Sequence, residues 1–134
     1  MSQEEKQLLL QDICARLPFG VICDRLGKHY PLIDIDIKRE LVYLLRDGNY
    51  VPYSILRGDI IQPYLRPMSK MTDEEKAQVQ TFMDIVTDEN YGDGYSPSAW
   101  DAMNGFVQYC DSHYLDHRGL IFRGIALEAP EGMY

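Results

Sequence analysis

The sequence contains no hydrophobic run that approaches the roughly 18 apolar residues of a membrane-spanning helix. Its first residues, MSQEEKQLLL, carry acidic side chains where a secretory signal has basic ones, and the apolar run Leu8–Leu10 is too short for the core of such a signal. Three cysteines, Cys14, Cys23 and Cys110, are widely spaced and odd in number, which argues against a disulfide framework. We therefore expect a cytoplasmic protein with reduced thiols and no membrane partner.

Catalytic motifs are also missing. The chain has no G-x-S-x-G motif, no glycine-rich phosphate loop and no dinucleotide-binding fingerprint, and it has three histidines in all. These absences count only weakly against an enzyme, because catalytic residues usually converge from distant positions in the chain. We predict no cofactor and favour a protein that is not an enzyme.

Basic residues are scarce in the second half of the chain. Residues 1–70 carry ten Lys or Arg against nine Asp or Glu, whereas residues 71–134 carry three against twelve, which together give the net charge of −8. The acidic half would repel nucleic-acid phosphates, so nucleic-acid binding is disfavoured unless the first half alone presents a basic face. The simplest role of the acidic residues is to keep the protein soluble.

What the chain does contain is typical of a globular protein. Its 134 residues are 46% hydrophobic and suffice for one domain, which we place at 1–134. We expect an α+β fold with a β-rich part at about 18–66 and a helical part at about 72–118.

Three helices are predicted. Ser2 and Glu5 form a capping box before an apolar stripe that ends at Pro18, which predicts a helix over 3–16. A second capping box, Thr72 with Glu75, predicts a helix near 73–86. After an acidic loop from Thr87 to Tyr95, Ser96 and Pro97 begin a helix over about 97–115. We expect its buried stripe to consist of Trp100, Met103, Val107, Cys110 and Tyr114.

Four or five short strands are predicted between the first two helices. They are 20–26, 32–37, 41–46, 50–56 and a very short one at Ile60–Ile61. In the second, Ile33, Ile35 and Ile37 alternate with polar residues, as in a half-buried strand. Asp47-Gly48 favours a tight hairpin, and Pro52 indicates an edge strand. We expect a small curled antiparallel sheet or an SH3-like barrel, closed by the first helix, and a last strand at 120–127.

The segment from Arg57 to Glu75, here called the hinge segment, separates the two parts and contains the first candidate site. Its prolines, Pro63 and Pro67, hold the residues before them extended, so that Tyr64 and Arg66 would be presented on a stiff backbone. Tyr and Arg are enriched at protein-binding hot spots, which predicts a partner-binding site at these four residues. The alternative is structural: Tyr64 and Leu65 would pack under the sheet, and Arg66 would pair with a carboxylate of the acidic helices.

A second candidate is a metal site at Cys110, His113 and His117. Spacings of three and four residues place these side chains near one face of a helix end. The alternative is again structural, because Cys110 belongs to the expected buried stripe. A histidine in the last helical turn is also favoured by the helix dipole without any ligand.

Three motifs resemble a known family. PYLRPMSKMTDEE in the hinge segment, CARLPFGV at Cys14–Val21 and LEAPEGMY at Leu127–Tyr134 resemble a family of small uncharacterised proteins from gut Bacteroidetes and their prophages. The resemblance implies no activity, ligand or catalytic residue. A phage or mobile-element origin would favour an accessory protein that binds host or phage proteins.

Taken together, the sequence favours a non-enzymatic binding or accessory protein that acts through a protein partner. One alternative is a metal-dependent enzyme built on Cys110, His113 and His117. Another is nucleic-acid binding by the small barrel, with the basic and aromatic side chains Arg25, Lys28, Lys38, Arg39, Tyr30 and Tyr43.

Overall fold

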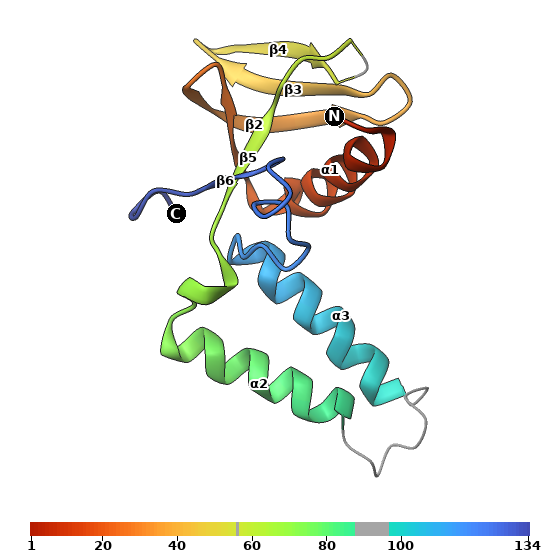
Figure 1. Ribbon diagram of the computed structural model, residues 1–134, viewed down its shortest axis with the longest axis vertical. Helices are drawn as coiled ribbons and strands as arrows, with labels where there is room; N and C mark the ends of the chain where they lie inside the picture. The colour runs from red at the N-terminus through yellow and green to blue at the C-terminus, as the bar shows by residue number, and fades with distance from the viewer. Residues whose placement is uncertain (56, 88–96) are drawn as a thin grey trace.

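The computed structural model describes residues 1–55, 57–87 and 97–134, and these form an α+β fold, which confirms the predicted fold class (Figure 1). The helices are α1 (Gln3–Arg16), α2 (Asp73–Thr87) and α3 (Pro97–Ser112), with short 3-10 turns η1 (Leu17–Phe19) and η2 (Met68–Lys70). The strands are β1 (Ile22–Arg25), β2 (Lys28–Asp36), β3 (Leu41–Arg46), β4 (Asn49–Ser54), β5 (Gln62–Leu65) and β6 (Leu127–Glu128). The predicted acidic loop, from residue 88 on, and the predicted cap at Ser96 lie outside the described residues.

The strands form one mixed sheet in the order β4-β3-β2-β1-β5-β6. The strands from β4 to β5 are antiparallel to their neighbours, and β6 pairs with β5 in parallel. The sheet is open, so the SH3-like barrel considered from the sequence is wrong. Closure would require the outer edge of β4 to pair, but Pro52 of β4 has no N–H, and the N–H of Ser54 is bonded to the side chain of Asp59 at 2.8 Å.

Helix α1 covers one face of the sheet (Figure 1). It begins as predicted, because Ser2 Oγ accepts from the N–H of Glu5 and the Glu5 carboxylate accepts from the N–H of Ser2. Its residues Leu9 and Ile13 are fully buried in the core, together with side chains of the sheet and of the segment 120–126. Burying two such side chains contributes about 3–6 kcal/mol, which holds α1 on the sheet.

Strand β2 departs from the alternation that the sequence suggested. The pairing with β3 shifts register between Leu32 and Asp34, which inserts a bulge into the strand. As a result Leu32 is buried, whereas Ile37 lies beyond the strand and is 66% exposed. The prediction that Ile33, Ile35 and Ile37 share one buried face is therefore wrong.

The hairpin between β3 and β4 forms as predicted. Asp47 and Gly48 both have positive φ, 51° and 79°, as a tight two-residue turn requires. The fifth strand lies two residues later than predicted, at Gln62–Leu65, because pairing of Cys23 with Pro63 and of Asp24 with Gln62 places the hinge segment inside the sheet. Of the predicted strand at 120–127, only Leu127 lies in a strand, β6, which continues to Glu128, and the chain before it turns back on itself.

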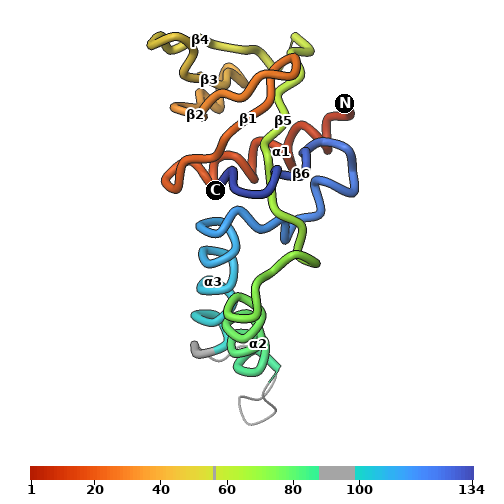
Figure 2. Tube along the Cα trace, turned by 90° about the vertical axis from the view of Figure 1, so that its left-hand side faces the viewer, coloured from red at the N-terminus to blue at the C-terminus, as the bar shows by residue number. Residues whose placement is uncertain are grey.

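Helices α2 and α3 form a hairpin that projects from the sheet, as both views show (Figure 1, Figure 2). The capping box of Thr72 and Glu75 is present, so α2 begins where the sequence predicted. Helix α3 ends at Ser112 and is three residues shorter than predicted. Its expected buried stripe is buried at Cys110 but not at Trp100 and Met103, which are 58% and 39% exposed. These two residues lie toward the far end of the hairpin, away from the end of α3 that contacts α1, and the buried residues beside them are Ala99 and Ala102.

Gly105 sets the spacing of this hairpin, because a Cβ atom there would lie 2.8 Å from Cε1 of Phe82 on α2. We expect Gly105→Ala to lower the free energy of unfolding by about 1 kcal/mol, since the overlap outweighs the gain in helix propensity. In a Phe82→Leu background the overlap is removed and the same change should be stabilising. A double-mutant cycle in urea measures both effects. Stabilisation by alanine in both backgrounds would show that Phe82 does not limit the spacing.

In the described part of the chain, no helix combines the length and the apolar character that crossing a membrane requires.

Candidate functional site

The end of β5 leads into a junction where the hinge segment, the start of α2 and the end of α3 meet. The N–H of Arg66 donates to the carbonyl of Tyr114 at 2.7 Å, and the N–H of Asp116 donates to the carbonyl of Arg66 at 2.9 Å. These two bonds attach the hinge segment to the chain that follows α3. Both the N–H and the carbonyl of Arg66 are therefore hydrogen-bonded, which fixes its backbone.

The Arg66 side chain binds the carboxylate of Glu75 on α2 through two hydrogen bonds. Its Nη1 and Nη2 atoms donate to Oε2 and Oε1 of Glu75 at 2.7 and 2.6 Å, and Nη1 also donates to the carbonyl of His113 at 3.0 Å. The Glu75 side chain is 5% exposed. The bidentate guanidinium, opposed by burial and aided by the N–H of Thr72, lowers the pKa of Glu75 from 4.5 to about 2. Glu75 is therefore ionised at neutral pH.

His113 is the third member of this cluster. Its Nδ1 lies 2.9 Å from Oε2 of Glu75, and since an ionised carboxylate can only accept, Nδ1 carries the proton. The imidazole stacks on the ring of Tyr109, with 4.1 Å between the ring centroids, and its side chain is 41% exposed. Within the described residues, Nε2 of His113 has no hydrogen-bond partner, so it is available to a ligand.

A groove of about 720 Å³ opens beside this cluster and is called the junction groove below. Its walls come from the hinge segment, the start of α2, the end of α3 and the C-terminal segment 129–134. The lining residues are Arg66, Pro67, Lys70, Thr72, Glu74, Glu75, Tyr109, His113, Ala129, Pro130, Glu131, Gly132 and Tyr134. The groove therefore combines apolar rings with charged side chains of both signs, as binding sites commonly do.

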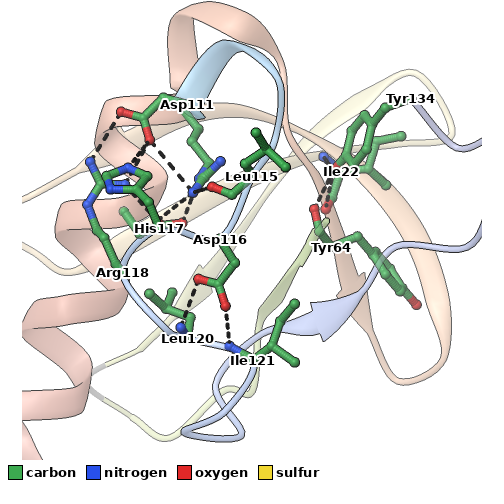
Figure 3. A network of polar contacts seen from close by, with 12 residues as sticks. Ile22, Tyr64, Asp111, Leu115, Asp116, His117, Arg118, Leu120, Ile121 and Tyr134 are labelled. Carbon is green, nitrogen blue, oxygen red and sulfur yellow. Dashed lines mark hydrogen bonds and ion pairs between the residues drawn. The ribbon is translucent and has the colours of Figure 1, made fainter. Parts of the chain in front are cut away.

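A second polar cluster fastens α1 to the end of α3 and is called the buried ion cluster below (Figure 3). Arg16, fully buried, donates to Asp12 from Nε at 2.9 Å and to the carbonyl of Leu115 from Nη2 at 2.7 Å. Arg118 joins Asp12 to Asp111, with 2.8 Å from its Nη1 atom to Oδ1 of each. Two arginines thus balance two aspartates in the interior.

Asp111 illustrates how the buried ion cluster tolerates charge. Burial alone would raise its pKa, but hydrogen bonds from His117 and Arg118 outweigh burial and lower the pKa from 3.8 to about 2. Five residues further along the chain, Asp116 accepts from the N–H groups of Leu120 and Ile121 at 2.8 and 2.9 Å (Figure 3). These contacts bend the segment that the sequence had suggested as a strand.

Tyr134 joins β1 to β5 (Figure 3). The strand register pairs Cys23 with Pro63, so Ile22 and Tyr64 occupy the next position along the two strands. There the hydroxyl of Tyr134 accepts from the N–H of Ile22 at 3.0 Å and donates to the carbonyl of Tyr64 at 2.7 Å. The ring of Tyr134 stacks on Tyr114, with 3.7 Å between the centroids. The C-terminal segment is therefore held in place as one wall of the junction groove.

Removing this hydroxyl should be measurable. We expect Tyr134→Phe to lower the free energy of unfolding by about 1–2 kcal/mol, because the N–H of Ile22 and the carbonyl of Tyr64 lose their shared partner. Urea unfolding measures the loss, and amide exchange should accelerate at Ile22. The matched control Tyr50→Phe changes a tyrosine that is 67% exposed and should stay within about 0.5 kcal/mol of wild type. Equal effects of the two substitutions would contradict the bridging role.

The four predicted partner-binding residues do not lie together: two are buried in β5, and two line the junction groove. Pro63 and Tyr64 are buried within β5, and the Tyr64 hydroxyl donates to Asp24 at 3.0 Å. Arg66 and Pro67 line the junction groove, but the guanidinium of Arg66 is engaged by Glu75. Tyr64 and Arg66 thus adopt the contacts of the structural alternative, and substituting either would change packing as well as any partner contact.

The three predicted metal ligands are not brought together. Cys110 is fully buried, and burial raises the pKa of its thiol to about 11, which disfavours the thiolate that binds metals. His113 faces Glu75, whereas His117 faces Asp111 at 2.9 Å in the buried ion cluster. Across residues 1–55, 57–87 and 97–134, no group of three or more His, Cys, Asp or Glu side chains is placed to hold a metal ion.

The residues proposed for nucleic-acid binding do not surround a closed barrel. Arg25 pairs with Asp59 at 3.3 Å and lies over the ring of Tyr53, and the ring of Tyr30 lies under Arg46. Lys28, Lys38 and Arg39 are exposed in or near the turns at the ends of β2. The open sheet leaves this alternative without the structural basis on which it was argued.

Glu75, Glu74 and Glu131 were not among the predicted site residues. The capping box located Glu75 at the start of α2, but nothing local in the sequence shows that its carboxylate also holds Arg66 and His113. Glu131 enters the groove because the C-terminal segment folds back beside β5. The acidic bias of residues 71–134 was the one available sign of free carboxylates.

Comparison with protein-family models, curated proteins and solved structures finds no match to this chain. Its function therefore has to be argued from the site itself.

Proposed function

We propose that this protein is a non-enzymatic accessory protein that binds a segment of a protein partner in the junction groove. The observation that carries the proposal is the groove itself: about 720 Å³ of space at the meeting point of hinge segment, helical hairpin and C-terminal segment. A prediction from the sequence placed partner binding at the hinge segment, and Arg66 and Pro67 of that prediction line the groove.

The charged lining separates into groups that are paired within the protein and groups that remain for a ligand. Arg66 and Glu75 are bonded to each other, and Lys70 is ion-paired with Glu128. Glu74 and Glu131 make no ion pair with any described residue, and Nε2 of His113 has no partner among them. The groove therefore offers a partner two carboxylates and one ring nitrogen beside the apolar surfaces of Pro67 and Pro130.

The hydroxyl groups in the groove favour binding over nucleophilic catalysis. His113 with Glu75 resembles the base and orienting carboxylate of a catalytic triad, which also needs a nucleophile within hydrogen-bond reach of the histidine. The hydroxyl of Thr72 instead accepts from the N–H of Glu75, and that of Tyr134 bridges β1 and β5. The third hydroxyl residue of the lining, Tyr109, stacks its ring on the imidazole. Among the described residues, none of the three hydroxyls is bonded to His113, which favours a ligand-binding role for the imidazole.

Affinity capture from a lysate of the native host tests the proposal. Tagged wild-type protein is compared with Glu74→Gln/Glu131→Gln, after nuclease treatment, and recovered proteins are quantified by mass spectrometry. The matched control Glu4→Gln/Asp101→Asn makes the same change in net charge at exposed positions outside the groove lining. We expect wild type and control to recover the same partner and the groove variant to recover at least about tenfold less. Equal recovery by all three proteins would refute the groove as the binding site.

A further inference from the structure

The charges of the junction groove leave an excess of carboxylate. Each cation in the lining is already paired, Arg66 with Glu75 and Lys70 with Glu128. Glu74 and Glu131 line the groove and form no ion pair with a described residue, although Glu131 lies close enough to Lys70 to help raise its pKa. A cationic group entering the groove would therefore find two carboxylates that are not held in an ion pair.

Two glutamates at the start of α2, Glu74 and Glu75, act electrostatically on Tyr109 in the groove wall. Burial raises the pKa of Tyr109, and the carboxylates of Glu75 and Glu74 raise it further, while Arg66 opposes them. Tyr109 lies in the groove wall beneath His113. At Tyr109 the carboxylates therefore outweigh the nearby guanidinium, which favours a cationic ligand at this wall.

The aromatic and proline side chains that line the junction groove favour a planar cation with an apolar stem. One face of the Tyr134 ring is covered by Tyr114, and the residue, which is 38% exposed, lines the groove and so adds aromatic surface to it. A planar guanidinium stacks on a tyrosine face and binds a carboxylate through two N–H groups at once. The rings of Pro67 and Pro130 offer apolar contact to the methylene groups behind such a head.

We propose that the junction groove recognises an arginine side chain of the partner, with the guanidinium bound between the Tyr134 ring and the carboxylates of Glu74 and Glu131. Arginine is preferred to lysine because an ammonium group is a compact, strongly hydrated charge that can neither stack nor form the paired bonds. This inference rests on the proposed function and specifies the chemistry of its partner.

The test uses three short peptides on the full chain: acetyl-Gly-Arg-Gly-amide, its lysine analogue and its citrulline analogue, which is planar but uncharged. Binding is followed by amide chemical-shift changes in NMR titrations. We expect the arginine peptide to shift groove resonances saturably with a Kd in the range of about 1 mM, and the lysine peptide to bind at least about threefold more weakly. The citrulline peptide should not saturate.

Two variants complete the design. Glu74→Gln/Glu131→Gln should weaken binding of the arginine peptide by at least about tenfold, and Glu4→Gln/Asp101→Asn should leave it unchanged. The inference is overturned if the arginine peptide gives no saturable shifts at roughly 20 mM, or if the three peptides bind alike. If partner capture depends on the groove but the arginine peptide does not bind, the proposed function stands and this inference fails. If the arginine peptide binds but no partner is captured through the groove, the selectivity of the groove for arginine stands and the proposed function fails.

Discussion

Arg16→Leu is expected to lower the free energy of unfolding by about 3–5 kcal/mol, the usual cost of removing one partner from a buried ion pair. Arg16 and Asp12 are both fully buried, and the guanidinium also satisfies the carbonyl of Leu115. Without Arg16, the two aspartates of the buried ion cluster share one arginine, Arg118. Most domains have only 5–15 kcal/mol of stability, so the loss should be evident in urea or thermal unfolding.

A matched double variant separates charge from size. In Asp12→Leu/Arg16→Leu the remaining ions, Asp111 and Arg118, still balance, because they bond through 2.8 and 3.2 Å contacts. We expect this variant to recover more than half of the loss seen in the single variant, since an apolar pair can replace a buried ion pair at little cost. If the single substitution costs less than about 1 kcal/mol, or the double variant is no more stable than the single one, the cluster does not hold α1 to α3 as described.

Stability should also fall steeply in acid. The pKa of Glu75 is about 2 in the folded protein against 4.5 as its ordinary value, so the folded state binds the proton less readily than the unfolded state. Its contribution to stability is present above pH 4.5 and is lost as the pH falls through about 2. The shift corresponds to about 3 kcal/mol for Glu75. Asp111, lowered from 3.8 to about 2, adds to the loss in the same direction.

The variant Glu75→Gln isolates the contribution of this residue. It keeps the size of the side chain but cannot ionise, so it should be less stable than wild type at neutral pH, and its stability should depend less on pH in the acidic range. Unfolding in urea at a series of pH values measures both slopes. Identical slopes for wild type and Glu75→Gln would show that the pairing with Arg66 does not lower the pKa of Glu75.

Local signals predicted the helix starts and the tight hairpin well. Ser2 with Glu5 and Thr72 with Glu75 each fix the first turn of a helix through contacts three residues apart, and Asp47-Gly48 fixes a turn through its own backbone. The sequence predicted less where an element forms only because a distant part of the chain lies beside it. Strand β5 forms because β1 lies beside it, whereas its one proline, Pro63, had predicted an extended backbone without showing that the segment joins the sheet.

The candidate site shows the same limit. Arg66 was singled out by its sequence context, yet its partner Glu75 and the groove walls from residues 129–134 are set by how the chain folds back. The buried ion cluster joins Asp12 to Arg118 across 106 positions of sequence, and no spacing rule predicts such a pair. Likewise, the apolar stripe of α3 marked a buried face at Cys110, but toward the start of the helix the buried residues are Ala99 and Ala102 rather than Trp100 and Met103.

Site-specific photo-crosslinking in the native host shows whether a partner contacts the junction groove. A photoreactive residue replaces Lys70, which is exposed and lines the groove, or Lys38, which is exposed in the turn between β2 and β3. We predict a crosslink to one protein from position 70 and none from position 38, and its loss when Glu74→Gln/Glu131→Gln is added. Crosslinking of the same protein from both positions, or from position 38 alone, would show that the partner does not bind specifically at the junction groove.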